Sequence, residues 1–210
     1  MRYEFITIEG NIGAGKTTLS NLLSQKLNAK LILEQFADNP FLPKFYENPQ
    51  QFAFPLELFF MAERYQQLTE LLGQKDIFHS CTVSDYLFTK SLLFAKANLK
   101  DDEFQLYKRL FDITYKNIIQ PDLIIYLHAN VRKLQENIKK RSRSYELNIP
   151  DEYLFKIQEV YLQYIKQINV PILLIDMAET DFVNHPDHIE GLLQELEKEF
   201  APGIHHIVLP

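Results

Sequence analysis

The segment "YEFITIEGNIGAGKTT", residues 3–18, decides the fold expected for this chain. Its first half, residues 3–9, is rich in β-branched and aromatic side chains, which favour a strand. Its second half matches the pattern G-x-x-x-x-G-K-[ST], and leucines on one face predict a helix from about residue 15 to 27. A glycine-rich loop between a strand and a helix predicts a phosphate-binding P-loop.

The residues of this loop predict how a nucleotide is bound. Glycines let successive backbone N–H groups point at phosphate oxygens, and the start of the helix adds a favourable dipole. Lys16 is expected to reach the β- and γ-phosphates, and the Thr17 hydroxyl is expected to bind Mg²⁺. The candidate nucleotide-binding residues are Gly10, Asn11, Ile12, Gly13, Ala14, Gly15, Lys16, Thr17 and Thr18. A P-loop alone does not distinguish a kinase from a GTPase, a motor or a switch protein.

Apolar runs alternate with helix-like segments along the rest of the chain. Four further strands are expected at residues 29–34, 77–85, 121–129 and 170–176. Helices are expected at residues 39–72, with breaks at Pro43, Pro49 and Pro55, and at 86–97, 101–119, 131–140, 151–167 and 187–200. This alternation indicates an α/β fold with a parallel five-stranded sheet flanked by helices. No repeat or linker interrupts it, so we expect a single domain over residues 1–210.

The composition favours a cytoplasmic protein. The chain has 210 residues, of which 46% are apolar and 24% are charged, as in one globular domain. A net charge of −6 argues against general nucleic-acid binding, which usually requires a basic surface. No apolar stretch reaches the roughly 18 residues that a membrane span needs. The single cysteine, Cys81, suits a reducing compartment and a buried apolar role.

Two carboxylates follow predicted strands, at the edge where a parallel sheet binds its ligands. Glu34 ends the strand over 29–34, beside the expected γ-phosphate, where it can accept a proton from an attacking hydroxyl. Its alternative role is a surface charge or a helix cap. Asp85 ends the strand over 77–85, and it can either bind Mg²⁺ or cap the helix expected at Tyr86.

A basic cluster follows the helix expected over 131–140. The segment "KKRSRSYELNIPDEYL", residues 139–154, begins with four basic residues within five positions. Such clusters are usually solvated surfaces, and some bind nucleic acid. In a phosphoryl-transfer enzyme the same cluster can form a lid, whose guanidinium groups bind the moving phosphoryl group and whose closure excludes water.

Together these motifs resemble the deoxynucleoside kinases, which use ATP to phosphorylate the 5′-hydroxyl of deoxyribonucleosides. The resemblance rests on "IEGNIGAGKTT" (8–18), Glu34, "FYENP" (45–49), "AERYQQL" (62–68), "RSRSYELNIPDEYL" (141–154) and "IDMAETDF" (175–182). It covers nearly the whole chain, and "NPFL" (39–42) and the compact length are similar to the bacterial branch. It implies a P-loop kinase fold with an arginine-rich lid at about residues 139–150.

The resemblance assigns roles in catalysis and in ATP binding. Glu34 would be the general base, and the lid arginines would stabilise the transferring phosphoryl group. The candidate catalytic residues are therefore Glu34, Lys16, Arg141 and Arg143. Asp181 and Phe182 would lie near the adenine of ATP, and the metal ligands would be Thr17 and Asp85. A homodimer formed through a helix pair is also implied.

The substrate side follows from the same resemblance. Tyr46 and Glu146 would hydrogen-bond the sugar 3′-hydroxyl, where crowding disfavours ribose. Glu57 and Arg64 would face the base, and Asp85 would lie near the 5′-hydroxyl.

Three positions depart from the family pattern. After the third strand the family often has Glu-Arg-Ser or Asp-Arg-Ser, whereas this chain has Asp85, Tyr86 and Leu87, which leaves the contacts to the 5′-hydroxyl open. Asn137 replaces a frequent arginine of the lid helix and removes one expected phosphate contact. Glu57 stands where the family commonly has glutamine.

Glu57 lies in the apolar run "PLELFFMAERY" (55–65), where a carboxylate is costly to bury unless it is paired. Glu57 and Arg64 are seven residues apart and fall on nearly the same helical face. They form either a structural ion pair or part of the base pocket, in which Arg64 keeps Glu57 ionised. An ionised carboxylate accepts both adjacent donors of guanine, so the sequence leans toward deoxyguanosine among the purines.

Two other functions stay open. A nucleoside monophosphate kinase, such as a thymidylate kinase, also has a P-loop and an arginine lid, but it would need extra cations for the phosphate of its acceptor. A non-catalytic nucleotide-binding subunit of a heterodimeric kinase would fit Tyr86 and Asn137, although the intact Lys16 and Glu34 argue against it. The base preference, donors other than ATP and feedback inhibition are not determined by the sequence.

Overall fold

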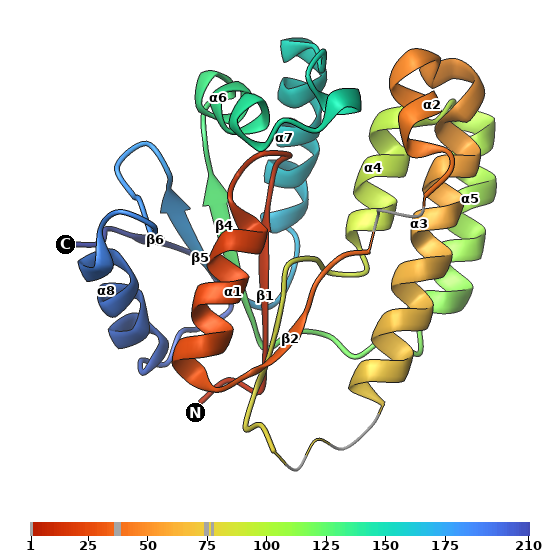
Figure 1. The fold of residues 1–210 in the computed structure, drawn as a ribbon. Coiled ribbons are helices and arrows are strands. Elements are labelled where there is room, and N and C mark those ends of the chain that lie inside the picture. Colours follow the sequence, from red (N-terminus) through yellow and green to blue (C-terminus); the bar gives the residue numbers. More distant parts are fainter. Residues whose placement is uncertain (1, 36–38, 74–75, 77) are drawn as a thin grey trace.

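The computed structural model of the chain describes residues 2–35, 39–73, 76 and 78–210 (Figure 1). Its strands are β1 (Phe5–Gly10), β2 (Lys30–Ile32), β3 (Thr82–Ser84), β4 (Leu123–His128), β5 (Pro171–Asp176) and β6 (Gly203–Ile207). Its helices are α1 (Lys16–Leu27), α2 (Leu42–Glu47), α3 (Pro49–Leu72), α4 (Lys90–Asn98), α5 (Asp101–Tyr115), α6 (Val131–Arg141), α7 (Asp151–Ile165) and α8 (Pro186–Leu196). A short 3-10 helix covers Ser144–Glu146.

The strands form one parallel six-stranded sheet in the order β2-β3-β1-β4-β5-β6. The expected α/β class with a parallel sheet is confirmed, but the sheet has a sixth strand in addition to the five expected. This strand, β6, pairs with β5 in a register that runs from Gly203 opposite Pro171 to Ile207 opposite Ile175. It is a partly exposed edge strand with two histidines, so it lacks the continuous apolar run that marks a buried strand.

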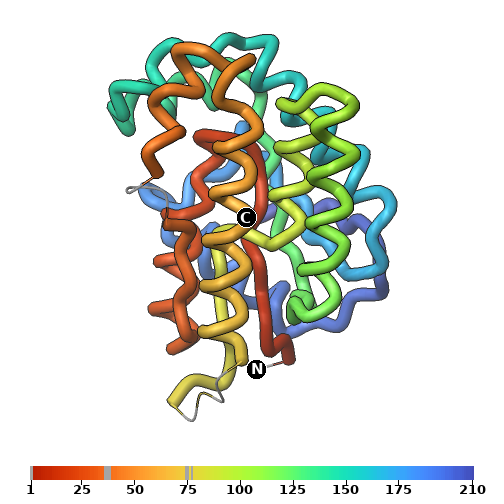
Figure 2. Tube along the Cα trace, turned by 90° about the vertical axis from the view of Figure 1, so that its right-hand side faces the viewer, coloured from red at the N-terminus to blue at the C-terminus, as the bar shows by residue number. Residues whose placement is uncertain are grey.

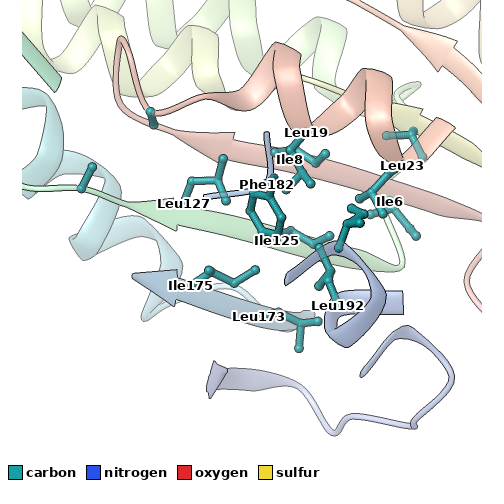
Figure 3. Packing of buried hydrophobic residues seen from close by; sticks show 14 of the residues in the cluster. Ile6, Ile8, Leu19, Leu23, Ile125, Leu127, Leu173, Ile175, Phe182 and Leu192 are labelled. Carbon is teal, nitrogen blue, oxygen red and sulfur yellow. The ribbon is translucent and has the colours of Figure 1, made fainter. Parts of the chain in front are cut away.

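Helices cover both faces of the sheet. On one face, Leu19 and Leu23 of α1 and Leu192 of α8 pack against alternate strand residues such as Ile6 and Ile125 (Figure 3). On the other face, α4 and α7 cover the intervening residues of β4 and β5. The helices α3 and α5 extend this second layer beyond α4, and they lie nearest the viewer in Figure 2. Because all strands are parallel, their carboxyl ends meet at one edge of the sheet, where β1 leads into the P-loop.

The helical run expected over 39–72 is two helices, α2 and α3. The chain leaves helical geometry at Asn48, where φ is −142° and ψ is 80°. Pro43 and Pro49 lie in first helical turns, where no backbone N–H is needed. Pro55, by contrast, lies inside α3 and does not end it, so one of the three expected breaks is wrong.

The segment around β3 is also shorter than expected. The strand expected over 77–85 begins at a residue outside the described part of the chain, and β3 covers only residues 82–84 of it. The helix expected at Tyr86 begins instead at Lys90, so Asp85 and Tyr86 lie in a connecting segment. Asp85 therefore does not cap that helix, and its alternative structural role is wrong.

Cys81, next to β3, is buried and 4% exposed. Burial raises the pKa of its thiol, so the group stays protonated and packs as a small apolar side chain, as expected. Among the helices of the described residues, none is both long and apolar enough to cross a membrane.

Candidate active site

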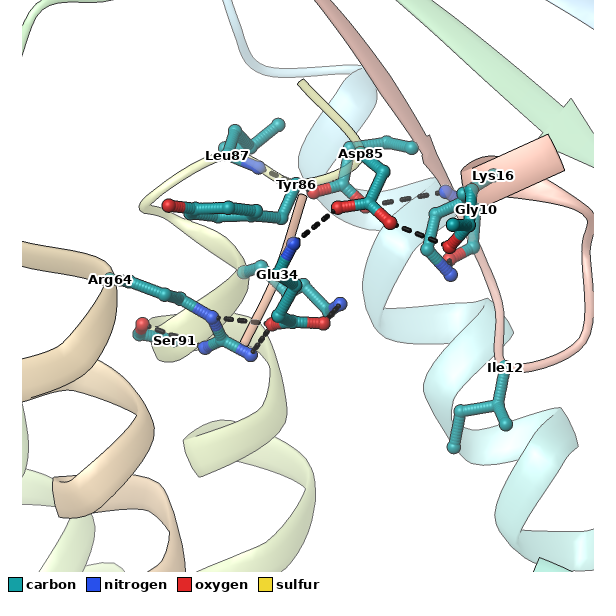
Figure 4. A network of polar contacts seen from close by, with 12 residues as sticks. Gly10, Ile12, Lys16, Glu34, Arg64, Asp85, Tyr86, Leu87 and Ser91 are labelled. Atoms are coloured by element: carbon teal, nitrogen blue, oxygen red, sulfur yellow. Dashed lines mark hydrogen bonds and ion pairs between the residues drawn. The ribbon is translucent and has the colours of Figure 1, made fainter. Parts of the chain in front are cut away.

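A central cleft lies at the carboxyl edge of the sheet, between the P-loop, the helices α2 to α4 and the lid segment, residues 139–150. This is the edge at which parallel α/β sheets bind their ligands. The fold brings eleven of the predicted site residues together as its lining: Ile12, Lys16, Thr17, Glu34, Tyr46, Glu57, Arg64, Asp85, Arg141, Arg143 and Glu146. Part of the polar network on the walls of the cleft is drawn in Figure 4.

Two glycines of the P-loop allow close contacts that a side chain would block. Gly10 has φ +151°, and a Cβ atom there would lie 2.7 Å from the carbonyl oxygen of Leu127 in β4. Gly13 has φ +81°, and its Cβ would lie 2.8 Å from the carbonyl oxygen of Leu134 in α6. The loop is thus packed tightly against the sheet and the lid helix, with its backbone left to face a phosphate.

The other loop residues have distinct surroundings. Asn11 is buried and its amide donates to the carbonyl of Leu154, 2.8 Å away, which fixes the loop to α7. Ala14 is buried beneath the loop, whereas Thr18 is exposed in the first turn of α1. Gly15, with φ +97°, is the residue before that helix.

Lys16 lies at the mouth of the P-loop. Its Nζ donates to the carbonyl oxygens of Gly10 at 3.0 Å and Asn11 at 2.9 Å. Burial lowers the pKa of Lys16 to about 8, and the positive charge of Lys90 contributes to this shift against the opposing carboxylates. A lysine held beside a second cation is suited to binding a dense negative charge such as a triphosphate.

Thr17 and Asp85 form an oxygen pair beside the P-loop. The Thr17 hydroxyl donates to Oδ2 of Asp85 at 2.6 Å, and the backbone N–H of Glu34 donates to Oδ1 at 2.7 Å. A hydroxyl and a carboxylate next to a phosphate site fit Mg²⁺, which prefers oxygen ligands and takes several from bound phosphates. Among the described residues there is no cluster of three or more histidine, cysteine or acidic side chains that would hold a metal by itself.

Glu34 is held by two cations. Its Oε1 accepts from Arg64, with Nε at 2.8 Å and Nη2 at 2.5 Å, and its Oε2 accepts from Nζ of Lys90 at 2.5 Å. Arg64 is fixed in turn by Ser91, whose Oγ lies 2.8 Å from Nη1, as Figure 4 shows. Burial by itself would raise the pKa of Glu34, but Arg64 and Lys90 outweigh it and lower the pKa to about 2. Glu34 is therefore an ionised carboxylate, and its alternative roles as a surface charge or a helix cap are wrong.

Glu57 is not paired with Arg64, so the structural ion pair, one of the two alternatives that the sequence left open, is wrong. Its Oε1 instead accepts from Nδ2 of Asn98, 2.7 Å away on α4. Its Oε2 is buried and has no hydrogen-bond partner within the described part of the chain. Burial raises the pKa of Glu57 to about 7, since the hydrogen bond from Asn98 and the charge of Arg64 offset it only in part. The expectation that Arg64 keeps Glu57 firmly ionised is wrong, because Arg64 is committed to Glu34.

The lid segment begins where α6 ends. Arg141 is the last residue of α6, and Ser142 follows in a left-handed conformation with φ +58°. Both lid arginines reach one carboxylate: Arg141 forms an ion pair with Oε2 of Glu146, and Nη1 of Arg143 lies 3.3 Å from Oε1. The fold thus brings Arg141, Arg143 and Glu146 together on one wall of the cleft.

Tyr46 lies on the α2 side of this wall. Its ring stacks on that of Tyr145 with 6.1 Å between centroids. Burial raises the pKa of Tyr46 well above its usual value, and the negative charge of Glu146 contributes. The phenol therefore stays protonated and can donate a hydrogen bond near Glu146.

Asp181 and Phe182 lie outside the central cleft. Asp181 lines a separate hollow with Lys133 and His185, and its carboxylate accepts from the backbone and amide of Asn184, which lower its pKa to about 2. Phe182 is 7% exposed and packs in the core beside Leu127, as Figure 3 shows.

Asn137, which stands where the family often has arginine, contacts the P-loop. Its Nδ2 donates to the carbonyl oxygen of Gly13 at 2.8 Å. Asn137 was expected only to lack the phosphate contact that an arginine would make. It instead connects the lid helix α6 to the P-loop.

The sequence did not predict three polar residues of the site. Lys90 lines the cleft, and Asn98 holds Glu57. Glu9 is buried at the end of β1 and accepts from the backbone N–H of Leu87 and the hydroxyl of Tyr161, each at 2.8 Å. The available signals were a lysine and an asparagine at the two ends of an apolar helix, and a glutamate at the end of a buried strand.

A P-loop that shares one cleft with an ionised carboxylate and a pair of lid arginines defines a nucleotide-dependent phosphotransferase. The family model described as "Deoxynucleoside kinase" matches residues 6–202, and the chain belongs to this family. The predicted family and enzyme class are therefore confirmed.

Individual relatives agree with this family. The chain is 34% identical to a deoxyguanosine kinase of Bacillus subtilis over 92% of this chain and 96% of the relative. It is 32% identical to a deoxyadenosine kinase of Dictyostelium discoideum over 93% of this chain and 78% of the relative. Among solved structures, deoxyadenosine kinase from M. mycoides with bound dATP superposes with a TM-score of 0.80 and 26% identity, covering 92% of this chain and all of that chain.

Proposed function

We propose that the protein transfers the γ-phosphoryl group of ATP to the 5′-hydroxyl of a deoxyribonucleoside. The single observation that carries this proposal is that ionised Glu34 lines the same cleft as the P-loop. In the reaction the 5′-oxygen forms a bond to the γ-phosphorus as the bond to the bridging oxygen breaks and ADP leaves. The hydroxyl proton passes to Glu34.

The low pKa of Glu34 suits a late proton transfer. A carboxylate with a pKa of about 2 is a weak base toward a free hydroxyl, but it is a good hydrogen-bond acceptor that orients the oxygen. The hydroxyl proton becomes strongly acidic only as the oxygen bonds to phosphorus. In a loose transition state this happens late, so a weakly basic carboxylate can still take the proton.

The donor is bound by groups of the P-loop and the lid. The loop backbone and Lys16 hold the phosphates, and Arg141 and Arg143 stabilise the charge on the transferring group. Thr17 and Asp85 would hold Mg²⁺, which neutralises phosphate charge when bound. Asp181 would lie near the adenine; Phe182 is buried beside it and would support the wall of that site.

We propose a deoxyribonucleoside as the acceptor because of the side chains on the wall of the cleft formed by α2 and the lid segment. Tyr46 and Glu146 line the cleft together, so a 3′-hydroxyl can donate to the carboxylate and accept from the phenol. The ring of Tyr145 stacks on that of Tyr46, and we propose that this pair disfavours a further hydroxyl on the sugar. Glu57 and Arg64, further inside the cleft, would face the base.

For the base we propose deoxyguanosine. Oε1 of Glu57 accepts from Asn98, and the buried Oε2 has no hydrogen-bond partner among the described residues. Guanine offers two adjacent donors, N1–H and the exocyclic amine, which stabilise the ionised carboxylate and lower its pKa on binding. The neutral acid, by contrast, both donates and accepts, so it would match adenine or cytosine. The similarity to a deoxyguanosine kinase also supports this choice, although other relatives carry the names of other bases.

The proposal is tested by initial rates with ATP on all four deoxynucleosides and on their 5′-monophosphates. We expect phosphorylation of the nucleosides, fastest with deoxyguanosine, and a 5′-monophosphate identified by ³¹P NMR. Turnover of the monophosphates alone would instead establish a monophosphate kinase. No turnover of any acceptor would support a non-catalytic subunit.

We also propose a cytoplasmic homodimer. Helix α5 carries three large apolar side chains at helical spacing on its exposed side, Leu106, Leu110 and Ile113, with Ile113 67% exposed. A second copy would cover this row as a helix pair. Light scattering after chromatography should give twice the chain mass of 24.8 kDa, and Ile113→Glu should reduce it to one chain mass. A single chain mass for the unmodified protein would contradict the dimer.

A further inference from the structure

Lys90 is a buried cation on the wall of the central cleft that faces the reacting groups. It begins α4, is 5% exposed, and lines the cleft beside Glu34. Its Nζ lies 2.5 Å from Oε2 of Glu34 and 5.7 Å from the centre of the Phe94 ring. Burying an ammonium group is costly, and it does not improve stability over a well-packed apolar side chain. A role in the reaction explains why a lysine occupies this position.

The charge of Glu34 is already balanced without Lys90. Arg64 makes two contacts to Oε1 and is itself fixed by Ser91 and by the ring of Phe60, 4.8 Å from its Cζ. Arg64 is therefore the fixed partner of Glu34, whereas Lys90 has a flexible stem and donates from Nζ to the other oxygen of the same carboxylate. Glu34 alone does not require this second cation, whose charge also acts on the buried carboxylate of Glu9.

The location of Lys90 connects the two ends of the reaction. Lys90 contacts Glu34, the proposed base. The charge of Lys90 also acts on the P-loop lysine Lys16, which binds the donor phosphates. Tyr86 is another residue of this segment that could donate a hydrogen bond to the reacting groups, but its side chain points away from the cleft. Its side chain is fully buried and its hydroxyl donates to Oε1 of Gln67 at 2.5 Å, on the α3 side of the core.

We propose that Lys90 is a catalytic residue, whose ammonium group donates to the acceptor oxygen and to the phosphoryl group as the new bond forms. When the 5′-hydroxyl proton passes to Glu34, the carboxylate becomes neutral and its hold on Lys90 weakens. The ammonium group then binds the developing charge on the phosphoryl oxygens, while Arg64 keeps Glu34 in place. This inference rests on the proposed function, because it assigns a further residue to that reaction.

The test compares Lys90→Met, which removes the charge at nearly constant volume, with Lys90→Arg, which keeps it. The matched control is Lys96→Met on the exposed face of the same helix. For Lys90→Met we expect kcat for deoxyguanosine to fall about 10²-fold with little change in KM, as for other groups that bind transition-state charge. Lys90→Arg should recover most of this loss, and Lys96→Met should match the unmodified enzyme.

Thermal midpoints and deoxyguanosine binding show whether each variant is folded, and Lys90→Gln replaces Lys90→Met if the latter does not fold. An unchanged kcat in a folded, uncharged variant would overturn the inference. A rise in KM alone would also overturn it, since it would show that Lys90 only helps to bind the nucleoside. Failure of the proposed function would look different, because the unmodified enzyme and Lys96→Met would then both be inactive.

Discussion

The carboxyl group of Glu57 is held by Asn98 and not by Arg64, although Arg64 lies two turns further along the same helix. Nδ2 of Asn98 lies 2.7 Å from Oε1 of Glu57, whereas the guanidinium of Arg64 is bound to Glu34. As a result the cleft holds one carboxylate that stays ionised and one whose pKa is near neutrality. The two groups are suited to different tasks, the first to the acceptor hydroxyl and the second to the base.

Glu57→Gln should stabilise the protein, and more so at alkaline pH. The folded pKa of about 7 lies above the ordinary value of 4.5, so ionisation of Glu57 opposes folding. The cost is absent below the ordinary pKa, grows as pH rises through the interval, and is complete above the folded pKa. It is on the order of 3 kcal/mol at most. We expect the thermal midpoint of Glu57→Gln to exceed that of the unmodified protein at about pH 8 and to approach it at about pH 4.

The matched control for this stability effect is Glu63→Gln, which is on the same helix but not buried. It should leave the pH dependence of the thermal midpoint unchanged. A Glu57→Gln variant with the same pH dependence as the unmodified protein would show that Glu57 does not titrate in this interval.

The same substitution should change the base preference. An amide donates and accepts, which suits adenine and cytosine, whereas ionised Glu57 accepts both donors of guanine. We expect Glu57→Gln to lower kcat/KM for deoxyguanosine relative to deoxyadenosine and deoxycytidine. In the unmodified enzyme the same ratio should rise with pH through about 7, because ionisation favours guanine. An identical ranking of the four deoxynucleosides in both proteins would exclude Glu57 as the residue that reads the base.

Much of this arrangement could be predicted because it depends on local patterns. The P-loop is recognised by its glycines and lysine, and Glu34 by its place at the end of a strand. The contacts of Lys90 and Asn98 depend instead on how α4 packs across from α3, a relationship between segments that no local spacing encodes. The possible pairing of Arg64 with Glu57 was wrong for the same reason. Helical spacing places Glu57 on the same face as Arg64, but the fold brings Glu34 from another segment into contact with Arg64.

Asn137→Ala should weaken ATP binding. The side chain connects α6 to the P-loop through its hydrogen bond to the carbonyl of Gly13. A hydrogen bond of this kind contributes about 1 kcal/mol, which corresponds to roughly a fivefold rise in KM for ATP. Glu136→Ala, at an exposed neighbouring position on the same helix, is the control and should leave KM unchanged. If Asn137→Ala also bound ATP normally, the contact would have no role in shaping the loop.

The pH dependence of kcat/KM for ATP should follow the ionisation of Lys16. Its pKa is lowered to about 8, so the free enzyme loses this positive charge as pH rises through that value. We expect kcat/KM for ATP to fall above about pH 8, whereas kcat at saturating ATP should fall at a higher pH because bound phosphate raises the pKa of Lys16. A value of kcat/KM for ATP that stays constant well above that pH would contradict the lowered pKa.

The most direct test of the role of Glu34 is the rate of phosphoryl transfer from ATP to deoxyguanosine in the unmodified enzyme and in Glu34→Gln. Glutamine keeps the size and the hydrogen-bond acceptor but cannot take the proton, so kcat should fall about 10² to 10⁴-fold. Deoxyguanosine should still bind, and Glu47→Gln, at an exposed position on α2, should turn over normally. A Glu34→Gln enzyme that phosphorylates deoxyguanosine as fast as the unmodified enzyme would contradict the assignment of Glu34 as the base.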